Sequence, residues 1–439
     1  MTKARRLPED VTIEIVELAP DGLGRGWHEE REVRLRGTLP GETATGAIRK
    51  RSRGMWLGDA VAVQSASPDR IAAPCSVFRR CGGCTFQHLL SKAELSLKTR
   101  EVETLLAQQG LRAQRWQTAV ASPLFGYRRK ARLGVRQVGQ QVYVGFREPF
   151  SGRVVDMTAC PVLHPPFDEL IDPLRRLVGG LSIASRIPQV EVAAGDSSAA
   201  VVLRHLDPLA PGDLSALDAF ARRSGIGVWL QPGGPESVEH YAGPDALLDY
   251  ANPDFGLIFQ FGPLDFVQVN AHINRQLVRA AVRAVADCGE VLDLFCGLGN
   301  FSLALARAGH VVTGIEAGEA AVDRARDNAA LNGLSKRSSF RAVDLYGPAG
   351  AVLPEAEVAE ALLLDPPRSG AGPNLRGWLS ASVRKVVYVS CNPVTFATDA
   401  VILKEAGFQL RDVGIFDMFP RTTHVETFGV FTREVGGNV

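Results

Sequence analysis

The sequence has almost no net charge and no long apolar run, and each absence excludes a class of protein. Its 49 Lys and Arg residues are balanced by 48 Asp and Glu, a formal net charge of +1, so no global basic field indicates nucleic-acid binding. No apolar stretch approaches the roughly 18 residues of a membrane span, and the start of the chain lacks the apolar core of a signal peptide. We therefore expect a cytoplasmic protein without a membrane segment.

Cysteine is also scarce, with seven residues, an odd number. In a cytoplasmic chain such cysteines are typical of metal ligands or catalytic thiols rather than disulfides. Four of them form a candidate set, namely Cys75, Cys81, Cys84 and the distant Cys160. Four thiolates suffice for tetrahedral zinc or for a [4Fe–4S] cluster. A zinc ribbon would prefer two close pairs, so the spacing favours the cluster; unrelated free thiols are the alternative.

The length and the residue pattern predict a multidomain protein with three parts. Residues 1–70 contain short β runs between Gly and Pro, which predicts a small five-stranded β-barrel. Residues 71–262 mix short β runs with helical stretches in an α+β pattern, and an amphipathic helix is expected near 92–109. Residues 263–439 alternate strands and helices, which predicts an α/β, Rossmann-like domain with a parallel sheet.

The last part can be divided further. Its periodicity predicts helices over 275–287, 301–308, 319–330 and 395–405, and strands over 291–295, 311–315, 361–364 and 386–390. In a doubly wound sheet, ligands bind beyond the carboxyl ends of the strands. The residues that follow these strands are therefore the candidates for a site.

One strand end is a glycine turn, in the run 291–300. Gly297 and Gly299 allow the backbone to approach a ligand closely. Glu316 ends the next strand, where it can accept hydrogen bonds from two ribose hydroxyls, and Asp344 can meet an adenine edge. The turn lacks the pyrophosphate-binding pattern Gly-x-Gly-x-x-Gly, which favours S-adenosylmethionine, a ligand without phosphates. The alternative is an ordinary strand–helix turn.

Two further strand ends present a carboxylate, Asp365, and a thiol, Cys391. Many amino-methyltransferases carry an aromatic where Arg368 stands, so direct amine methylation is disfavoured. Carbon 5 of uracil is a poor nucleophile, but a thiolate added at C6 converts the ring to an enolate that can attack a sulfonium methyl group. A base must then remove the C5 proton so that the thiolate can leave.

These requirements assign roles. Cys391 suits the nucleophile, and the helix expected after it should lower its thiol pKa. Asp365 suits the uracil edge, and Glu426, in a late loop, suits the base, with His424 as a hydrogen-bonding neighbour. The alternatives are a cysteine that only packs at a strand end and a solvated glutamate.

Several runs resemble the signatures of the RNA uracil-C5 methyltransferases, and of the branch that acts on bacterial 23S ribosomal RNA. They are 365–370, 388–395 and 417–426, supported by 265–270, 127–133 and the cysteines, so that the resemblance covers nearly the whole chain. Two departures are Arg421, where the 23S branch tends to show His, and Pro367, where it often has Ala. Both leave the target RNA open.

The resemblance implies a set of roles. Cys391 would be the nucleophile and Glu426 the base. The S-adenosylmethionine site would be lined by Gln268, Phe295, Asn300, Glu316, Asp344 and Asp365. The [4Fe–4S] cluster would be held by Cys75, Cys81, Cys84 and Cys160. The first 70 residues would form a TRAM domain, an OB-like RNA-binding module, and a helix near 92–120 would pack on the catalytic domain.

Two basic runs are candidates for RNA contact, 47–56, which ends in Trp56, and 127–136. Cations for phosphates with aromatics for splayed bases are typical of single-stranded RNA binding, although a charge run is also typical of a solvated face. The target base must leave its stack, so the expected partner is a single-stranded or opened segment of 23S ribosomal RNA, bound by a monomer.

Other functions remain open at this stage. The enzyme could modify another 23S site or a transfer RNA, or could methylate an amine or another nucleobase. A non-catalytic iron–sulfur RNA-binding assembly factor is the alternative from a different class, against which Cys391 and Glu426 argue.

Overall fold

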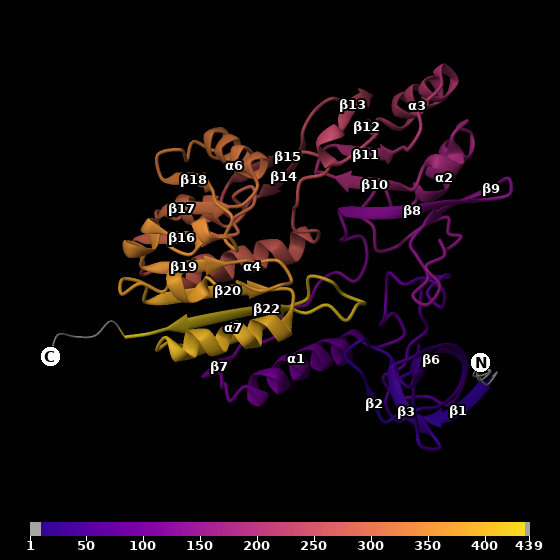
Figure 1. Ribbon diagram of the computed structural model, residues 1–439, viewed down its shortest axis with the longest axis horizontal. Helices are drawn as coiled ribbons and strands as arrows, with labels where there is room; N and C mark the ends of the chain where they lie inside the picture. Colours follow the sequence, from indigo (N-terminus) through magenta and orange to yellow (C-terminus); the bar gives the residue numbers. More distant parts are fainter. Residues whose placement is uncertain (1–9, 435–439) are drawn as a thin grey trace.

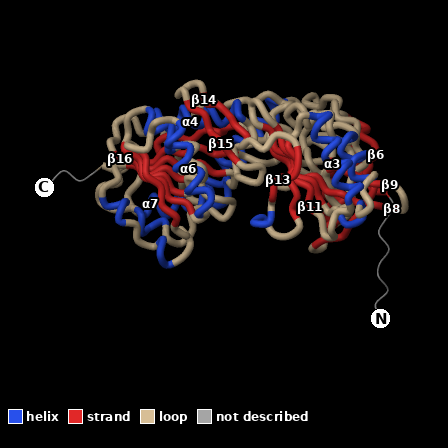
Figure 2. Tube along the Cα trace, turned by 90° about the horizontal axis from the view of Figure 1, so that it is seen from above, coloured by secondary structure: helices blue, strands red, loops and turns tan. Residues whose placement is uncertain are grey.

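The computed structural model describes residues 10–434 and arranges them around three larger sheets (Figure 1). Residues 1–9 of the predicted barrel and 435–439 of the predicted catalytic domain lie outside the described residues. The central sheet and the C-terminal sheet lie side by side along the long axis, as Figure 2 shows. Within the described part, no helix is both long and apolar enough to cross a membrane.

The N-terminal sheet has six strands in the order β1-β5-β6-β4-β3-β2. They are β1 (Asp10–Glu14), β2 (Glu17–Leu18), β3 (Gly24–His28), β4 (Arg31–Arg36), β5 (Thr43–Ser52) and β6 (Met55–Ser65). Alternate residues such as Val11, Ile13 and Leu35 are buried in one core, as period-2 strands require. Val16 lies just after β1, at one edge of the sheet, and its N–H donates to the Arg25 carbonyl of β3, near the other edge (2.9 Å). The sheet is therefore curled so that its two edges approach each other. The prediction of five strands missed the two-residue β2.

The central sheet also has six strands, in the order β13-β12-β11-β10-β8-β9. They are β8 (Lys130–Val138), β9 (Gln141–Gly145), β10 (Gln189–Ala194), β11 (Ala199–Arg204), β12 (Gly227–Gln231) and β13 (Glu239–Ala242), with α2 (Ile171–Gly179) and α3 (Pro211–Ser224). The hairpin of β14 (Leu248–Asn252) and β15 (Leu257–Phe261) follows. Its aromatics Tyr250, Phe259 and Phe261 pack in the same core as the helices and strands after residue 270.

The C-terminal sheet has eight strands in the order β18-β17-β16-β19-β20-β22-β21-β7. They are β16 (Glu290–Leu294), β17 (Val311–Glu316), β18 (Ser338–Ala342), β19 (Ala361–Leu364), β20 (Lys385–Ser390), β21 (Gln409–Phe416), β22 (Glu426–Thr432) and β7 (Arg115–Trp116). The run from β18 to β20 is parallel, whereas β22 is antiparallel to both of its neighbours. The alternating pattern thus predicted a parallel sheet correctly, but not the antiparallel strand.

Four helices accompany this sheet, α4 (Ala271–Ala284), α5 (Ser302–Arg307), α6 (Glu319–Leu331) and α7 (Pro393–Glu405). The predicted helices and strands of this part agree with the structure to within four residues at each end. Asn270 caps α4 by accepting from the Ile273 N–H (3.3 Å), and Asn392 caps α7 by accepting from Val394 (3.2 Å).

A segment from before the central sheet completes this end of the molecule. The region near 92–120 forms α1 (Ser91–Gln108) and β7. Val102 and Leu106 of α1 are buried in one core with Leu403 of α7 and Phe408, and β7 pairs in parallel with β21. Figure 1 shows α1 running beside α7. Residues three hundred positions apart therefore share one hydrophobic core.

Leu106→Ala should destabilise the protein by about 2–5 kcal/mol, because a fully buried leucine leaves a cavity in a core that α1 and α7 share. The measurement is the free energy of unfolding from denaturant titration. Glu103→Ala, at an exposed position of the same helix, is the control and should change it by less than about 0.5 kcal/mol. Equal effects of the two substitutions would contradict the packing of α1.

Candidate active site

Three neighbouring parallel strands end at the same edge of the sheet. Phe295 follows β16, Asp365 follows β19 and Cys391 follows β20, and these strands are adjacent in the order β16-β19-β20. The structure therefore places the glycine turn, the carboxylate and the thiol side by side. This edge, outside the carboxyl ends of parallel strands, is where such folds bind ligands.

The glycine turn has a strained backbone. Phe295, Gly297 and Gly299 have φ angles of +64°, +53° and +91°, a region that glycine adopts readily but phenylalanine does not. Glu316 supports the turn, because its carboxylate accepts from the Gly297 N–H (3.2 Å) and from Ala317 (2.7 Å). Strain of this kind is concentrated at functional sites, which supports the prediction that the turn binds a ligand.

The other predicted ligands of the cofactor differ in their availability. Asp344 is exposed, and its carboxylate accepts a hydrogen bond from the Tyr346 N–H (3.0 Å). Tyr346 lies beside the Phe295 ring (5.8 Å between centroids). The Asn300 amide, in contrast, is engaged with Asn274 and Tyr250 at 2.8–3.1 Å. Asn300 therefore holds the turn against α4, and its side chain faces protein groups.

Glu426 is brought to Cys391 by strand pairing. It is the first residue of β22 and only 3% exposed, so the expectation of a residue in a late loop is wrong. The register pairs Ser390 of β20 with Thr427 of β22, which sets Cys391 opposite Glu426. Asp365 lies on the adjacent strand end, where its carboxylate accepts a hydrogen bond from the Gln268 amide (3.0 Å).

Burial dominates the electrostatics of these three groups. It raises the pKa of Asp365 and, together with the charge of Asp365, raises the pKa of Glu426 well above its ordinary value. Two carboxylates that influence each other in this way disfavour simultaneous ionisation. Both carboxyl groups therefore hold their protons to a higher pH than exposed acids do.

The thiol pKa of Cys391 is raised, whereas the sequence predicted that it would be lowered. Burial raises the pKa of its thiol to about 11, and the charges of Glu426 and Asp365 act in the same direction, with Arg368 opposing them. The predicted lowering by a helix is wrong, because Cys391 precedes the cap of α7. A helix terminus contributes about 0.3–1 kcal/mol, less than the ~1.4 kcal/mol of one pKa unit. The surroundings of Cys391 in this structure therefore favour the neutral thiol.

His424 lies half-buried with its ring against Phe419 (5.5 Å, edge-to-face). Burial lowers its pKa, and the positive charges of Arg368, Lys98 and Arg128 do so further. A lowered pKa leaves the imidazole neutral, a form that suits both a hydrogen-bonding neighbour and a second base.

The four clustered cysteines face a common region. The pKa of Cys84 is raised by burial and by Cys160, Cys81 and Cys75, and that of Cys160 by burial and by Cys81 and Cys75. Backbone N–H groups point at the sulfurs, such as Gly83 at Cys81 (3.3 Å). Yet between residues 10 and 434 no three His, Cys, Asp or Glu side chains are close enough to share one metal ion.

The four thiols are a donor set that suits either a tetrahedral zinc ion or a four-iron cubane. The cluster therefore stays a prediction from the sequence.

The two basic runs differ in exposure. In 47–56 the cations Arg49, Lys50, Arg51 and Arg53 are exposed, and Trp56 packs under Arg31 (4.6 Å). In 127–136 several cations are engaged by protein groups: Arg129 pairs with Asp196, Arg132 pairs with Glu191, and Lys130 donates to the Asp265 carbonyl. Contact of this run with RNA stays a prediction.

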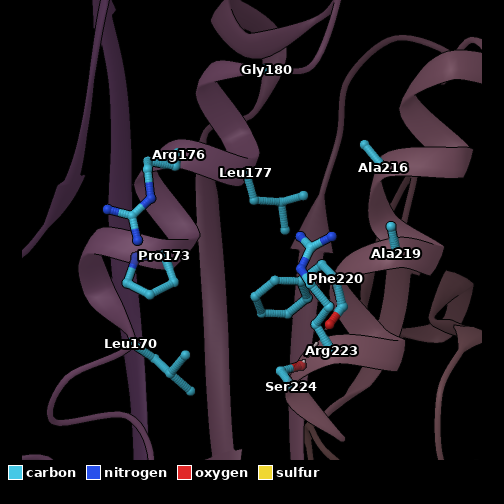
Figure 3. Close-up of a pocket in the computed structure, with 10 residues that line it drawn as sticks. All are labelled: Leu170, Pro173, Arg176, Leu177, Gly180, Ala216, Ala219, Phe220, Arg223 and Ser224. Atoms are coloured by element: carbon cyan, nitrogen blue, oxygen red, sulfur yellow. Dashed lines mark hydrogen bonds between the residues drawn. The ribbon is translucent and has the colours of Figure 1, made fainter.

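Two features were not singled out from the sequence. Phe266 is 75% exposed, two residues from Gln268, and an exposed ring there can stack on a base; its position inside the 265–270 run was the available signal. A groove of about 640 Å³ also lies between α2 and α3, lined by Leu177, Phe220 and Arg223 among others (Figure 3). No strand-end residue lines it.

The chain is similar to known proteins over nearly its whole length. The family described as tRNA (Uracil-5-)-methyltransferase matches residues 253–343 and 350–435. Proteins named 23S rRNA (uracil(1939)-C(5))-methyltransferase RlmD are similar over almost the full length. The one from Alkalilimnicola ehrlichii is 43% identical, covering 98% of this chain and 99% of the relative. That from Methylococcus capsulatus is 42% identical, with the same coverage.

A solved structure has the same fold. The tRNA (uracil-54, C5)-methyltransferase of Pyrococcus abyssi, in complex with S-adenosyl-L-homocysteine, superposes with a TM-score of 0.75. The match covers 96% of this chain and 100% of that chain, at 22% identity. The Rossmann-like methyltransferase architecture predicted for the last part is thereby confirmed.

Glu426→Gln should speed the alkylation of Cys391 at pH 9. The substitution removes a negative charge that raises the thiol pKa, and below that pKa each unit of lowering increases the thiolate about tenfold. Iodoacetamide labelling followed by mass spectrometry of the Cys391 peptide measures the rate. Glu405→Gln, an exposed residue at the far end of α7, is the control, and equal rates in the two variants would rule out the proposed proximity.

Proposed function

The chain belongs to the RNA uracil-C5 methyltransferases, and from this premise we propose that it transfers a methyl group from S-adenosylmethionine to C5 of a uridine in 23S ribosomal RNA. Relatives that are 39–43% identical over nearly the whole chain and are named for uracil 1939 of that RNA support the substrate. The observation that carries the chemistry is the β20–β22 register, which sets Cys391 opposite Glu426.

The proposed reaction begins at sulfur. The Cys391 thiolate adds to C6 of uracil, which forms a C6–S bond and moves an electron pair onto C5. C5 then attacks the sulfonium methyl group and releases S-adenosylhomocysteine. Glu426 removes the C5 proton, the C5–C6 double bond returns, and the C6–S bond breaks to regenerate the thiolate.

The two carboxylates are proposed to act on different parts of the ring. Asp365 would bind the N3/O4 edge of uracil while the enolate forms. Glu426, whose pKa is raised by burial and by the charge of Asp365, would in its ionised form be a stronger base for the C5 proton than an exposed glutamate.

The proposed cofactor site extends from this edge along the sheet. Glu316 would bind the ribose hydroxyls and Asp344 the adenine edge, with Phe295 beside the ring. Gln268 and Asp365 would close the side next to uracil, since the two are hydrogen-bonded. Asn300 would contribute through its backbone, because its amide is engaged with Asn274 and Tyr250.

Cys75, Cys81, Cys84 and Cys160 are proposed to hold a [4Fe–4S] cluster with a structural role. The mutual effect of their thiols on one another's pKa supports this assignment, as does their spacing along the sequence. Such a cluster would tie residue 160 to the segment after residue 75. Iron and sulfide analysis of anaerobically purified protein should give four of each, and zinc in their place would contradict the assignment.

The proposed division of labour follows the three parts. Residues 1–70 would be a TRAM, OB-like RNA-binding barrel, residues 71–262 the iron–sulfur and RNA-binding domain, and residues 263–439 the methyltransferase domain. The exposed cations of 47–56 support RNA contact by the first part. The partner would be an opened or single-stranded segment of 23S ribosomal RNA, bound by a cytoplasmic monomer. Another RNA target, such as a transfer RNA, is the alternative.

Labelled S-adenosylmethionine and unmethylated 23S ribosomal RNA test the reaction. Methyl label should appear on uracil C5, and Cys391→Ala should lower the rate by at least about 10³-fold, because the nucleophile is lost. Cys288→Ala removes a buried thiol outside the site and is the matched control. An active Cys391→Ala enzyme would refute the mechanism, and label at another position would indicate a different methyltransferase.

Glu426→Gln should trap the covalent RNA adduct, because methylation can proceed while removal of the C5 proton stalls. Denaturing electrophoresis should show a band of protein bound to RNA that carries the methyl label. Free, fully methylated RNA at the wild-type rate would show that another group is the base.

A further inference from the structure

The loop 417–425, which joins β21 to β22 and leads into Glu426, is held from outside the sheet. Four consecutive carbonyls of this loop, those of residues 418–421, each accept hydrogen bonds from distant segments. The donors are Asn270 to Met418 (3.2 Å), Lys98 to Phe419 (3.2 Å), the Tyr127 hydroxyl to Pro420 (3.1 Å), and the Thr85 and Phe86 N–H groups to Arg421 (2.7 and 3.0 Å).

A buried charge network lies beneath these contacts. Lys98 of α1 is 1% exposed, and its ammonium group lies 2.8 Å from Glu94 and 2.7 Å from Asp417. Glu94 also accepts from the Arg421 N–H (2.7 Å), and the Arg421 side chain donates to the Leu89 carbonyl (2.6 Å). Two cations and two carboxylates therefore balance one another, and Lys98 is the cation that contacts both acids.

The network holds a backbone conformation that the loop sequence does not favour. Arg421 has a φ angle of +68°, in the left-handed region, which a residue with a side chain adopts only where its surroundings enforce it. Its N–H is held by Glu94, and its carbonyl by Thr85 and Phe86. Thr85 directly follows Cys84, so the proposed cluster segment contacts the same residue.

We propose that Lys98 is a positioning residue that acts through the loop 417–425 to direct the Glu426 carboxylate at the C5 proton. This inference rests on the proposed function. Lys98 lies on α1, and its contacts are with Glu94, Asp417 and Phe419 rather than with the strand-end residues. Cys391, Phe295 and Asp365 follow parallel strands outside this loop. Among the proposed cofactor residues, Gln268 is linked to the loop through Asn270, whose amide donates to the Met418 carbonyl.

Loss of Lys98 should therefore affect the two halves of the reaction, methyl transfer and release of the methylated RNA, differently. Without Lys98, addition of Cys391 and methyl transfer should stay within about threefold of the wild-type rate. Release of methylated RNA should slow by about tenfold or more, because a well-placed general base contributes ~10²–10⁴-fold. The covalent adduct should accumulate, which a loss of folded protein would not produce.

The experiment is a single turnover of full-length protein with labelled S-adenosylmethionine and unmethylated 23S ribosomal RNA. Denatured samples give the amounts of adduct and of released methylated RNA over time. Lys98→Met keeps the length of the side chain and removes the charge. Lys92→Met makes the same change at an exposed position of α1 and should match wild type in both rates.

Because Lys98→Met leaves two buried acids without their cation, thermal melts decide whether it folds. Tyr127→Phe is the second variant, since it removes only the hydrogen bond to the Pro420 carbonyl and should shift the same ratio by a smaller factor. Unchanged adduct fractions in the folded variants, or equal slowing of addition and release, would overturn the proposal. A wild-type protein that methylates no RNA would instead overturn the proposed function, and this inference with it.

Discussion

The antiparallel pairing of β22 between β20 and β21 is the constraint on which the site depends. In a purely parallel sheet, every strand end at this edge would be a carboxyl end, and a residue such as Glu426 could reach it only from a loop. By running the other way, β22 brings its first residue to the edge, opposite Cys391. The main-chain pairing of Ser390 with Thr427 thus brings the proposed nucleophile and the proposed base, each next in the chain to one of these residues, to the same edge.

Burial has the largest effect on the pKa values of the groups at this edge. Burial raises the pKa of Cys391, Asp365 and Glu426, the charge of Asp365 raises that of Glu426 further, and both acids raise that of the thiol. The site therefore disfavours the ionised form of each of the three groups. Arg368 is the nearby cation that opposes the effect on Cys391.

The parts of the chain before residue 262 do more than offer a surface for RNA. The helix α1 completes a core with α7, β7 extends the C-terminal sheet, and the hairpin β14–β15 packs against the helices that follow it. Breaking a buried ion pair typically costs about 3–5 kcal/mol, so the contacts of Lys98 tie α1 firmly to the loop before Glu426. Binding segments and catalytic edge therefore behave as one structure.

The sequence by itself determined the alternating strands and helices after residue 263 and the strand ends that carry Phe295, Asp365 and Cys391. Those features are local: periodicity and turn residues specify a strand or helix from its own side chains. Only the tertiary structure decided that Glu426 opens an antiparallel strand, that burial overrides the helix in setting the pKa of Cys391, and that Arg129 and Lys130 are engaged. Each of these depends on residues far apart in the chain, whose meeting no local pattern encodes.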